Sequence, residues 1–583
     1  MNYRPIAVID PIIKLYSSIL NSRLIHFTEE HSLRASAQAG FRPGLSTLHP
    51  LFTLQHFIDK CSYNKQPLYC CFLDLKSAYD RVQRPLLWAV LGRLGIAGTF
   101  LQAVQSLYHD STYAINIQGR VGPPSVSTAG VKQGCPLSPT LFGLFLDGLQ
   151  RYLEAECPLS GPVLNNCDHV SVLKYADDVA LLATSPSQLQ DLVRATSDFC
   201  SAVGLLISSS KSSVMTFSAA PQPPLDITSH GQVIPCVSQA RYLGLVFDEK
   251  HGSAPSCQAR RFKLLGAWAV LQRQYAGLRC SLSLQLIVQL YNACVLPTGS
   301  YGAEIWAFQR MCAGHARERQ NIEFLRLLHL RQLAGLRKTV SGQIVLEEFQ
   351  CLPMRSEWIR SQTTFWNNLV KLGGNSLYKA ILFDNVIDAE IFQHRNWTHF
   401  FYQQLDQIGY SVIHGVGHLQ GIDHTCVAVL LQENFARLFT NVDVCPRTCQ
   451  SEGAALCTYH NWFRLRSSQA VHFLKKVNYP AHISLIRTFL RFRLGSHNLP
   501  NVLGRFLRVP RCQRVCHVCH ATVIGDEYHL VFECAALSAL RASYSRLFGP
   551  DIRTMQQFVW QKDLLGVMHY VKDALAVLTD IIA

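Results

Sequence analysis

Long apolar runs, tandem repeats and low-complexity segments are all missing from this sequence of 583 residues. Because no run reaches the roughly 18 uncharged residues of a membrane-spanning helix, the sequence excludes a helical membrane protein. Because no pattern recurs with a fixed period, it also excludes a solenoid. Residues 1–14 lack the basic start, apolar core and small-residue cleavage site of a secretory leader. We therefore expect a soluble intracellular protein of the nucleus or cytoplasm, neither secreted nor membrane-bound.

Acidic residues are scarce relative to basic ones, with 39 Asp and Glu against 54 Lys and Arg. The resulting net charge of +15 and the pI near 9.0 predict a polyanionic partner. Without a secretory leader, 21 cysteines indicate a reducing compartment, where most thiols, such as Cys70 and Cys71, serve as small buried side chains. A chain of this length should form roughly three or four domains.

Two consecutive carboxylates, Asp177 and Asp178, stand in an alternating segment, residues 170–183, that predicts strand, tight turn and strand. A third, Asp74, ends the short apolar run of residues 69–73, which also predicts a strand. Such a cluster of acidic oxygens would be repulsive unless neutralised, and two Mg²⁺ ions about 3.5 to 4 Å apart would neutralise it and support nucleotidyl transfer. Mn²⁺ is a possible substitute. The alternative is that these are ordinary turn and surface aspartates.

Three segments resemble, in the same order, the polymerase motifs of reverse transcriptases from non-LTR (LINE-type) retrotransposons. They are Phe72-Leu73-Asp74 with Ala78-Tyr79-Asp80, Gln133-Gly134-Cys135-Pro136-Leu137-Ser138-Pro139, and Tyr175-Ala176-Asp177-Asp178. Flanking segments resemble the fingers, the part after the metal site, the primer grip and the thumb: Asn2-Tyr3-Arg4-Pro5-Ile6, residues 38–47, 204–211, 242–244 and 301–306. The resemblance implies an RNA-directed DNA polymerase that extends a DNA primer 3′-OH on an RNA template.

The resemblance also implies roles for individual residues. Asp74 and Asp177 would hold both metal ions, and Asp178 would lie near the primer end with a lesser part. Leu75 would offer its carbonyl oxygen to a metal ion. Tyr79 would be a steric gate that excludes a ribose 2′-OH, whereas from sequence alone it could be a core tyrosine.

Three further residues would contact the incoming nucleotide. Gln133 would contact the nucleotide itself, Arg42 its phosphates, and Lys211 would neutralise or protonate the departing pyrophosphate. By default, an Arg or Lys at such a position is a solvated charge. Ser208 and Leu45 depart from the family pattern, which usually has Asn and a basic residue there, but neither departure removes a metal ligand.

Comparison with LINE proteins also suggests what this chain lacks. From the resemblance we expect that the chain starts inside the fingers and contains no endonuclease before the polymerase motifs or after Cys534. We therefore expect an endonuclease-lacking fragment that depends on an endonuclease supplied in trans to nick the target DNA. The alternative function is a catalytically silent nucleic-acid-binding remnant.

A CxxC pair, Cys516 and Cys519, is followed by His529 and Cys534. Three thiolates and one imidazole satisfy tetrahedral Zn²⁺, and the short loop between the pairs lets both reach one ion. The segment resembles the Cys-Cys-His-Cys element downstream of the polymerase in LINE proteins, and closed coordination predicts a structural zinc. A second set with looser spacing comprises Cys445, Cys449, Cys457 and His460.

These observations predict an α+β right-hand polymerase with a mostly helical C-terminal region. Residues 1–248 would be fingers and palm, and residues 251–354 a helical thumb with its extension. Residues 355–480 show helical periodicity without an assignable motif. Residues 481–583 would contain a basic helix, the zinc knuckle at 516–534 and a helical tail. The expected partners are an RNA template, a DNA primer or target DNA, and dNTPs.

Overall fold

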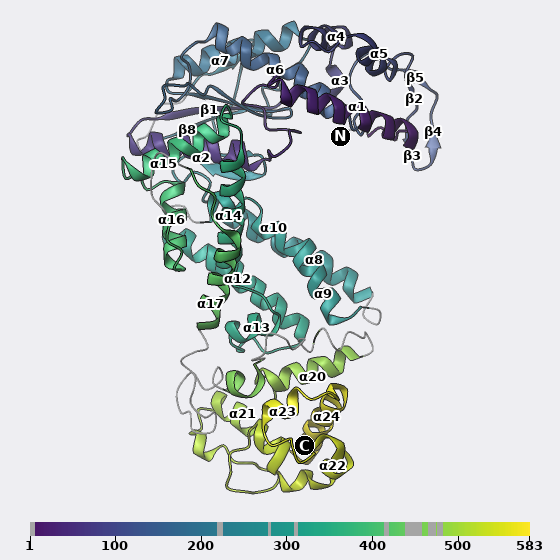
Figure 1. Cartoon of the computed structure of the whole chain (residues 1–583), viewed down its shortest axis with the longest axis vertical. Coiled ribbons are helices and arrows are strands. Elements are labelled where there is room, and N and C mark those ends of the chain that lie inside the picture. Colours follow the sequence, from purple (N-terminus) through teal and green to yellow (C-terminus); the bar gives the residue numbers. More distant parts are fainter. Residues whose placement is uncertain are drawn as a thin grey trace.

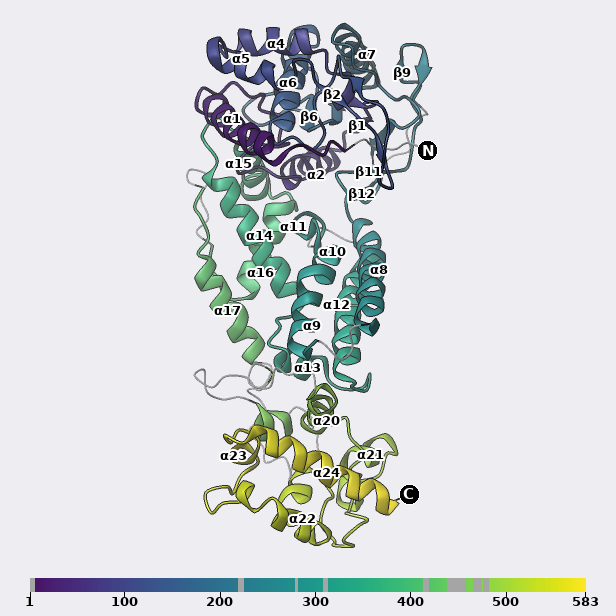
Figure 2. The same cartoon turned by 90° about the vertical axis from the view of Figure 1, so that its right-hand side faces the viewer.

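A computed structural model describes residues 6–218, 225–277, 282–307, 313–412, 419–437, 458–464, 474 and 482–582. The molecule is elongated, with a mixed helix and sheet tier at the N-terminal end, a helical middle tier, and a C-terminal tier at the opposite end (Figures 1 and 2). Residues 2–5 of the first fingers segment, and Cys445, Cys449 and Cys457 of the second zinc set, lie outside the described residues.

A four-stranded antiparallel sheet forms the centre of the N-terminal tier. Its order is β6 (Val172–Tyr175), β7 (Asp178–Ala183), β1 (Leu68–Leu73) and β8 (Ser213–Phe217). The predicted strand at 69–73 and the strand, turn and strand at 170–183 are therefore confirmed.

Both faces of this sheet are covered, which explains why the central strand β1 is apolar along its whole length. Tyr69, Cys71 and Leu73 belong to one buried cluster, with helices α6 (Ser138–Glu156) and α7 (Pro186–Ala202). The alternate residues of β1 belong to a second cluster with helix α2 (Leu48–Tyr63) and the helical tier. Successive side chains of a strand point to opposite faces, so this sheet needs apolar residues at every position of β1.

The long helix α1 (Pro11–Glu30) and several shorter elements complete this tier around the sheet. Helix α1 begins where the Asp10 side chain accepts the Ile12 N–H and Pro11 occupies the first turn. The other elements are α3 (Ala78–Arg81), α4 (Arg84–Arg93), α5 (Gly98–Ser106), β2 (Thr112–Tyr113), β3 (Asn116–Ile117), β4 (Arg120–Val121), β5 (Ser125–Val126), β9 (Thr228–Ser229), β10 (Gln232–Val233), β11 (Gln239–Tyr242) and β12 (Leu245–Asp248).

The middle tier is entirely helical in its described residues. It comprises α8 (Ser256–Gly277), α9 (Leu284–Leu290), a π-helical turn (Tyr291–Val295), α10 (Leu296–Ser300), α11 (Ala303–Trp306), α12 (Ala313–Ala334), α13 (Gly342–Glu348), α14 (Met354–Lys371), α15 (Leu377–Glu390), α16 (Trp397–Gln407) and α17 (His424–Arg437). Buried aromatic rings join its helices, as where Trp366 stacks on Trp397. Helices α11 and α15 contact α2 and so connect this tier to the sheet.

The C-terminal tier packs small helices around α24. Among the described residues, its α-helices are α20 (Ile483–Arg493), α21 (Pro500–Phe506), α22 (Ser538–Ser543), α23 (Met555–Val559) and α24 (Leu564–Ile582). Short π- and 3₁₀-helical turns span Tyr459–Phe463, Arg511–Gln513, His529–Glu533, Ala535–Leu537 and Ser545–Leu547. Helix α20 lies against α24, and the buried Arg493 donates to Glu348 of α13 at 2.8 Å, which joins this tier to the middle one. The α+β class with a mostly helical C-terminal region is confirmed. Among the described residues, none of the helices combines the length and apolar character needed to cross a membrane.

Candidate nucleotidyl-transfer site and zinc centre

The three predicted catalytic aspartates lie at one end of the central sheet. In the β1–β7 pair Leu73 is opposite Val179, and in the β6–β7 pair Tyr175 is opposite Asp178. Asp74 directly follows β1, so this register brings it beside the tight turn that carries Asp177. Asp74 and Asp177 are half-buried and Asp178 is exposed. The fold thus gathers, at one edge, carboxylates that are about a hundred residues apart in the chain.

The backbone around Asp74 is fixed from a neighbouring segment. The Asp74 N–H donates to Ser212 Oγ at 3.1 Å, and the Asp74 carbonyl accepts the Ser208 N–H at 2.8 Å. Leu75, the predicted carbonyl ligand, forms a β-bridge with Ile207 and is buried. Ser208 makes its contact to Asp74 through the backbone, so the departure from the family residue at this position leaves that contact intact.

Tyr79 lies between the core and the acidic edge. Its ring stacks on Phe142 with the centroids 4.5 Å apart. Burial, and then the Asp177 carboxylate, raise the pKa of the Tyr79 phenol, so the two side chains are electrostatic neighbours. The structure therefore combines features of a core tyrosine with proximity to a predicted metal ligand, and the gate role stays a prediction.

The other predicted nucleotide contacts have different surroundings. Gln133 Nε2 is 3.3 Å from Asp80 Oδ1, and the backbone carbonyl of Gln133 accepts the Ala7 N–H at 2.7 Å. Lys211 is exposed. Both residues are accessible to a ligand.

Arg42 is held in a structural ion pair. Its Nε and Nη2 donate to the two carboxylate oxygens of Glu29 at 2.8 and 2.7 Å, and Nη1 donates to the Ala35 carbonyl at 3.0 Å. Burial lowers the pKa of Arg42, but Glu29, together with Asp147 and Tyr378, more than compensates, so the net shift is upward. A phosphate contact by Arg42 stays a prediction, and it would require the guanidinium to share or leave Glu29.

Carboxylate oxygens are the ligands that Mg²⁺ prefers, so the donors at the acidic edge fit the predicted metal. Within the described part of the chain, however, no choice of one carboxylate oxygen from each of Asp74, Asp177 and Asp178 places all three oxygens within 4.8 Å of one another. Binding of Mg²⁺ by these carboxylates therefore stays a prediction.

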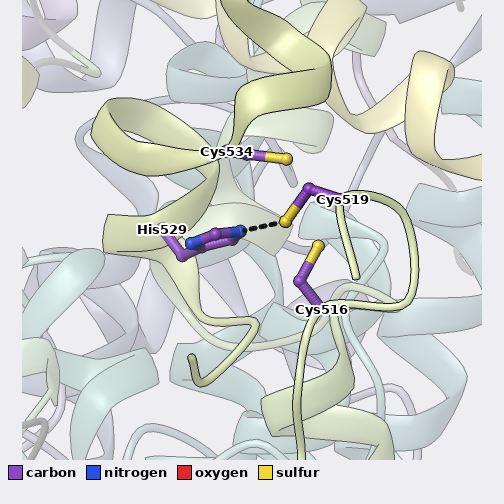
Figure 3. Close-up of side chains that lie close together, drawn as sticks. All are labelled: Cys516, Cys519, His529 and Cys534. Atoms are coloured by element: carbon purple, nitrogen blue, oxygen red, sulfur yellow. Dashed lines mark hydrogen bonds between the residues drawn. The ribbon is translucent and has the colours of Figure 1, made fainter. Parts of the chain in front are cut away.

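Cys516, Cys519, His529 and Cys534 converge in the C-terminal tier, as Figure 3 shows. Their ligand atoms all lie within 4.8 Å of one another, and Cys519 Sγ is 3.3 Å from His529 Nε2. The second imidazole nitrogen, Nδ1, is 3.4 Å from Glu533 Oε2, a partner of the kind that orients zinc-bound histidines. The donor set, the convergence and this outer partner all fit tetrahedral Zn²⁺.

The local electrostatics favour a thiolate at Cys516, whereas burial and then the neighbouring Cys516 raise the pKa of the Cys534 thiol to about 12. Burial raises the pKa of the Cys516 thiol, but hydrogen bonds from His529 and from the backbone of Cys519 and Val518 outweigh it and lower the pKa to about 6. A thiolate is the form of cysteine that binds metals. Of the second predicted zinc set, only His460 is among the described residues, so this grouping stays a prediction.

Sequence reasoning did not identify a buried polar cluster between α2 and α15. His56 Nε2 is 2.7 Å from Asp384 Oδ2, and Lys60 Nζ is 2.6 Å from the same oxygen. Asp388 is also in this group. Because Lys60 already provides the compensating cation, we interpret the cluster as an ion-pair network that joins two tiers, not as a metal site. The residues from α2 and those from α15 are more than 300 positions apart in the chain, so no local sequence motif indicates this cluster.

Sequence reasoning also gave no role to Gln38, which contacts the turn between β6 and β7 directly. Its side chain is fully buried, and its Oε1 accepts the Ala176 N–H at 2.9 Å. The only available signal was its place in a segment that resembles the fingers.

Comparisons with known proteins show what the chain is similar to. Residues 1–267 match the family model of reverse transcriptases (RNA-dependent DNA polymerases). The chain is 26% identical over 319 residues to a probable RNA-directed DNA polymerase from transposon BS of Drosophila melanogaster, covering 52% of this chain and 34% of the relative. It is 25% identical over 346 residues to the RNA-directed DNA polymerase from mobile element jockey of the same organism, covering 57% and 36%.

A third relative is the Pol polyprotein from type-1 retrotransposable element R2 of Popillia japonica, 30% identical over 216 residues, covering 36% of this chain and 29% of the relative. The matched parts thus span about a third of the length of these curated relatives. Among solved structures, apo telomerase from Candida tropicalis aligns with a TM-score of 0.32 and 11% identity, covering 63% of this chain and 61% of that one. Residues 1–267 of this chain form a reverse transcriptase domain, and the chain is related to the RNA-directed DNA polymerases of non-LTR transposons.

Proposed function

We propose that the chain is an RNA-directed DNA polymerase of a LINE-type element, which extends the 3′-OH of a DNA primer on an RNA template. The observation that carries this proposal is the juxtaposition of Asp74 with the Asp177–Asp178 turn at one end of the central sheet. The register creates an acidic edge suited to hard cations within a domain of the reverse transcriptase family. The net charge of +15 is consistent with nucleic-acid substrates.

Asp74 and Asp177 would hold two Mg²⁺ ions, with Mn²⁺ as a possible replacement. The ions would supply activation of the attacking 3′-OH and neutralisation of the leaving pyrophosphate. Asp178 is the exposed member of the three and would contribute through its charge near the primer end. The carbonyl of Leu75, in the backbone that the Ser208–Ser212 segment holds, would complete the ligand set.

The remaining residues would position the nucleotide. The Tyr79 ring, supported by its stack on Phe142, would block the space of a 2′-OH. Gln133 would contact the incoming dNTP, and the exposed Lys211 would neutralise the pyrophosphate or protonate it as it departs. Cys516, Cys519, His529 and Cys534 would bind a structural Zn²⁺ that stabilises the C-terminal tier.

A catalytically silent nucleic-acid-binding remnant is the second candidate. The observation that favours it is the engagement of Arg42 with Glu29, because this guanidinium would be the predicted phosphate contact. The two candidates differ in whether purified protein incorporates dNTPs.

Primer extension on an RNA template with Mg²⁺ tests the proposal. Removing a residue that only hydrogen-bonds to a metal ligand typically lowers activity about 10- to 100-fold, and removing the ligand itself should cost more. We therefore expect Asp74→Asn to lower extension by more than about 100-fold while template–primer binding persists. The matched control is Asp168→Asn, whose carboxylate contacts only its neighbour Asn166 among the described residues and should leave extension unchanged. Wild-type protein that binds template and primer but does not extend would favour the remnant.

A further inference from the structure

We propose that Gln38 is a positioning residue for the Asp177–Asp178 turn, and that helix α15 of the middle tier holds the backbone beside Gln38 in place through Tyr378. This inference rests on the proposed function, since it assigns the turn a catalytic geometry that must be held. It gives residues 377–390, part of a region to which the sequence assigns no role, a specific task in the reaction.

Gln38 holds both backbone polar groups of the residue before the aspartates. Its Oε1 accepts the N–H groups of Ala176 and Gly40, each at 2.9 Å, and its Nε2 lies 3.4 Å from the Ala176 carbonyl. Ala176 has φ of +56°, a left-handed conformation that residues with a Cβ seldom adopt. Because this conformation is disfavoured in isolation, the turn needs outside contacts to keep Asp177 in place, and Gln38 supplies them.

The backbone around Gln38 is built onto the free edge of the sheet. Gln38 forms a parallel bridge with Lys174 of β6, and the Ala39 N–H donates to the Lys174 carbonyl at 2.9 Å. A Cβ at Gly40 would stand 2.3 Å from the Ala176 nitrogen, so only glycine permits this approach. The segment therefore acts as a short added strand whose buried glutamine reaches over the end of β6.

Helix α15 fixes this added strand from the other side. The Tyr378 hydroxyl donates to the Ala37 carbonyl at 3.1 Å, one residue before Gln38, and the Tyr378 ring is fully buried. The ion pairs of His56 and Lys60 with Asp384, described above, attach the same helix to α2. The hydrogen-bonded path from α15 to the turn thus runs through Tyr378, Ala37, Gln38 and Ala176.

Catalytic groups must be held within about 0.5 Å of the productive geometry, and second-layer hydrogen bonds provide that precision. Gln38 is fully buried, so it does not touch substrate. Its loss should therefore lower kcat and weaken metal binding at the acidic edge, while KM for dNTP and the affinity for template and primer change little.

The experiment compares Gln38→Met with Gln55→Met. Gln55 is a matched control because it too is buried and its Oε1 accepts a backbone N–H, that of Ser253 at 3.1 Å, away from the turn. We expect Gln38→Met to lower kcat about 10- to 100-fold, the range for outer partners of metal ligands, with KM within about twofold. Gln55→Met should leave kcat unchanged. The second readout is Mn²⁺ binding, followed by electron paramagnetic resonance in the complex with dNTP and a 3′-deoxy primer, which should weaken only in Gln38→Met.

A milder variant keeps the proposal testable if Gln38→Met does not fold. Tyr378→Phe removes only the hydroxyl and should lower kcat by about two- to tenfold, the equivalent of one neutral hydrogen bond. Its control, Tyr570→Phe, removes a buried hydroxyl that donates to the Leu530 carbonyl in the C-terminal tier. Equal effects of test and control variants, or unchanged kcat and Mn²⁺ affinity in Gln38→Met, would overturn the inference. Wild-type protein without extension would overturn the proposed function instead, and the Mn²⁺ comparison would still decide the role of Gln38.

Discussion

A buried charge cluster near the Asp177–Asp178 turn makes a quantitative prediction possible. Arg34 Nε donates to Asp147 Oδ2 at 2.8 Å, and Lys174 Nζ lies 3.4 Å from Asp147 Oδ1. The side chains are 1%, 4% and 0% exposed for Arg34, Asp147 and Lys174, so two cations share one carboxylate away from water. Lys174 stands in β6, three residues before Asp177. Burial lowers the pKa of Lys174, and Asp147 only partly offsets this.

Asp147→Asn would leave both cations without their counter-charge. Removing one partner of a buried pair costs about 3 to 5 kcal/mol, and the second cation places this site at the upper end of that range. Lys174→Met, in contrast, should change stability by less than about 1 kcal/mol, because it leaves one cation balanced by one anion and fills a similar volume. The exposed Asp191–Arg194 pair provides the control, since Asp191→Asn should cost less than about 1 kcal/mol.

Hydrogen exchange is a suitable measurement, because unfolding of a chain with several tiers is not a single two-state transition. Amide protection in α6 and β6 should fall on the order of 10³- to 10⁴-fold in Asp147→Asn and stay nearly unchanged in the other two variants. Protection in Asp147→Asn that matches wild type would refute the argument. So would a Lys174→Met variant as unstable as Asp147→Asn, because it would show that the lysine is a net stabilising partner.

Three other predictions concern the site and the zinc centre. Tyr79→Ala should reduce discrimination against ribonucleotides in primer extension, because it removes the ring that would clash with the 2′-OH. Unchanged selectivity in an active variant would leave Tyr79 as a core residue. Arg42→Ala should raise KM for every dNTP if the guanidinium reaches the phosphates, whereas lowered thermal stability with unchanged KM would assign it to the Glu29 ion pair alone. Purified protein should contain one zinc ion per chain. The double variant Cys516→Ser, Cys519→Ser should release this zinc and unfold the zinc knuckle at 516–534, because metal binding there supplies folding free energy. Freshly reduced protein without zinc by elemental analysis would contradict that last prediction, and extension of a preformed primer should survive the double substitution.

Local patterns were sufficient to predict much of this protein. The apolar run before Asp74, the alternating residues around Asp177, and the spacing of Cys516, Cys519, His529 and Cys534 each predicted an arrangement that the structure contains. These predictions were possible because strand periodicity, turn chemistry and zinc-ligand spacing act over a few residues. The amphipathic patterns of α20 and α24 were predictable for the same reason.

Tertiary structure alone decided which distant groups meet. Nothing near Arg42 in the chain indicates its pairing with Glu29, and nothing near Tyr378 indicates its bond to Ala37 more than 300 residues away. Such contacts depend on how packed helices and sheet edges bring buried polar groups within hydrogen-bonding distance, and a buried polar group must find a partner wherever the fold provides one. The sequence by itself therefore determined the motifs that resemble those of reverse transcriptases and the spacing of the Cys and His side chains, while the packing of α2 and α15 on the sheet decided which distant groups meet beside the turn between β6 and β7.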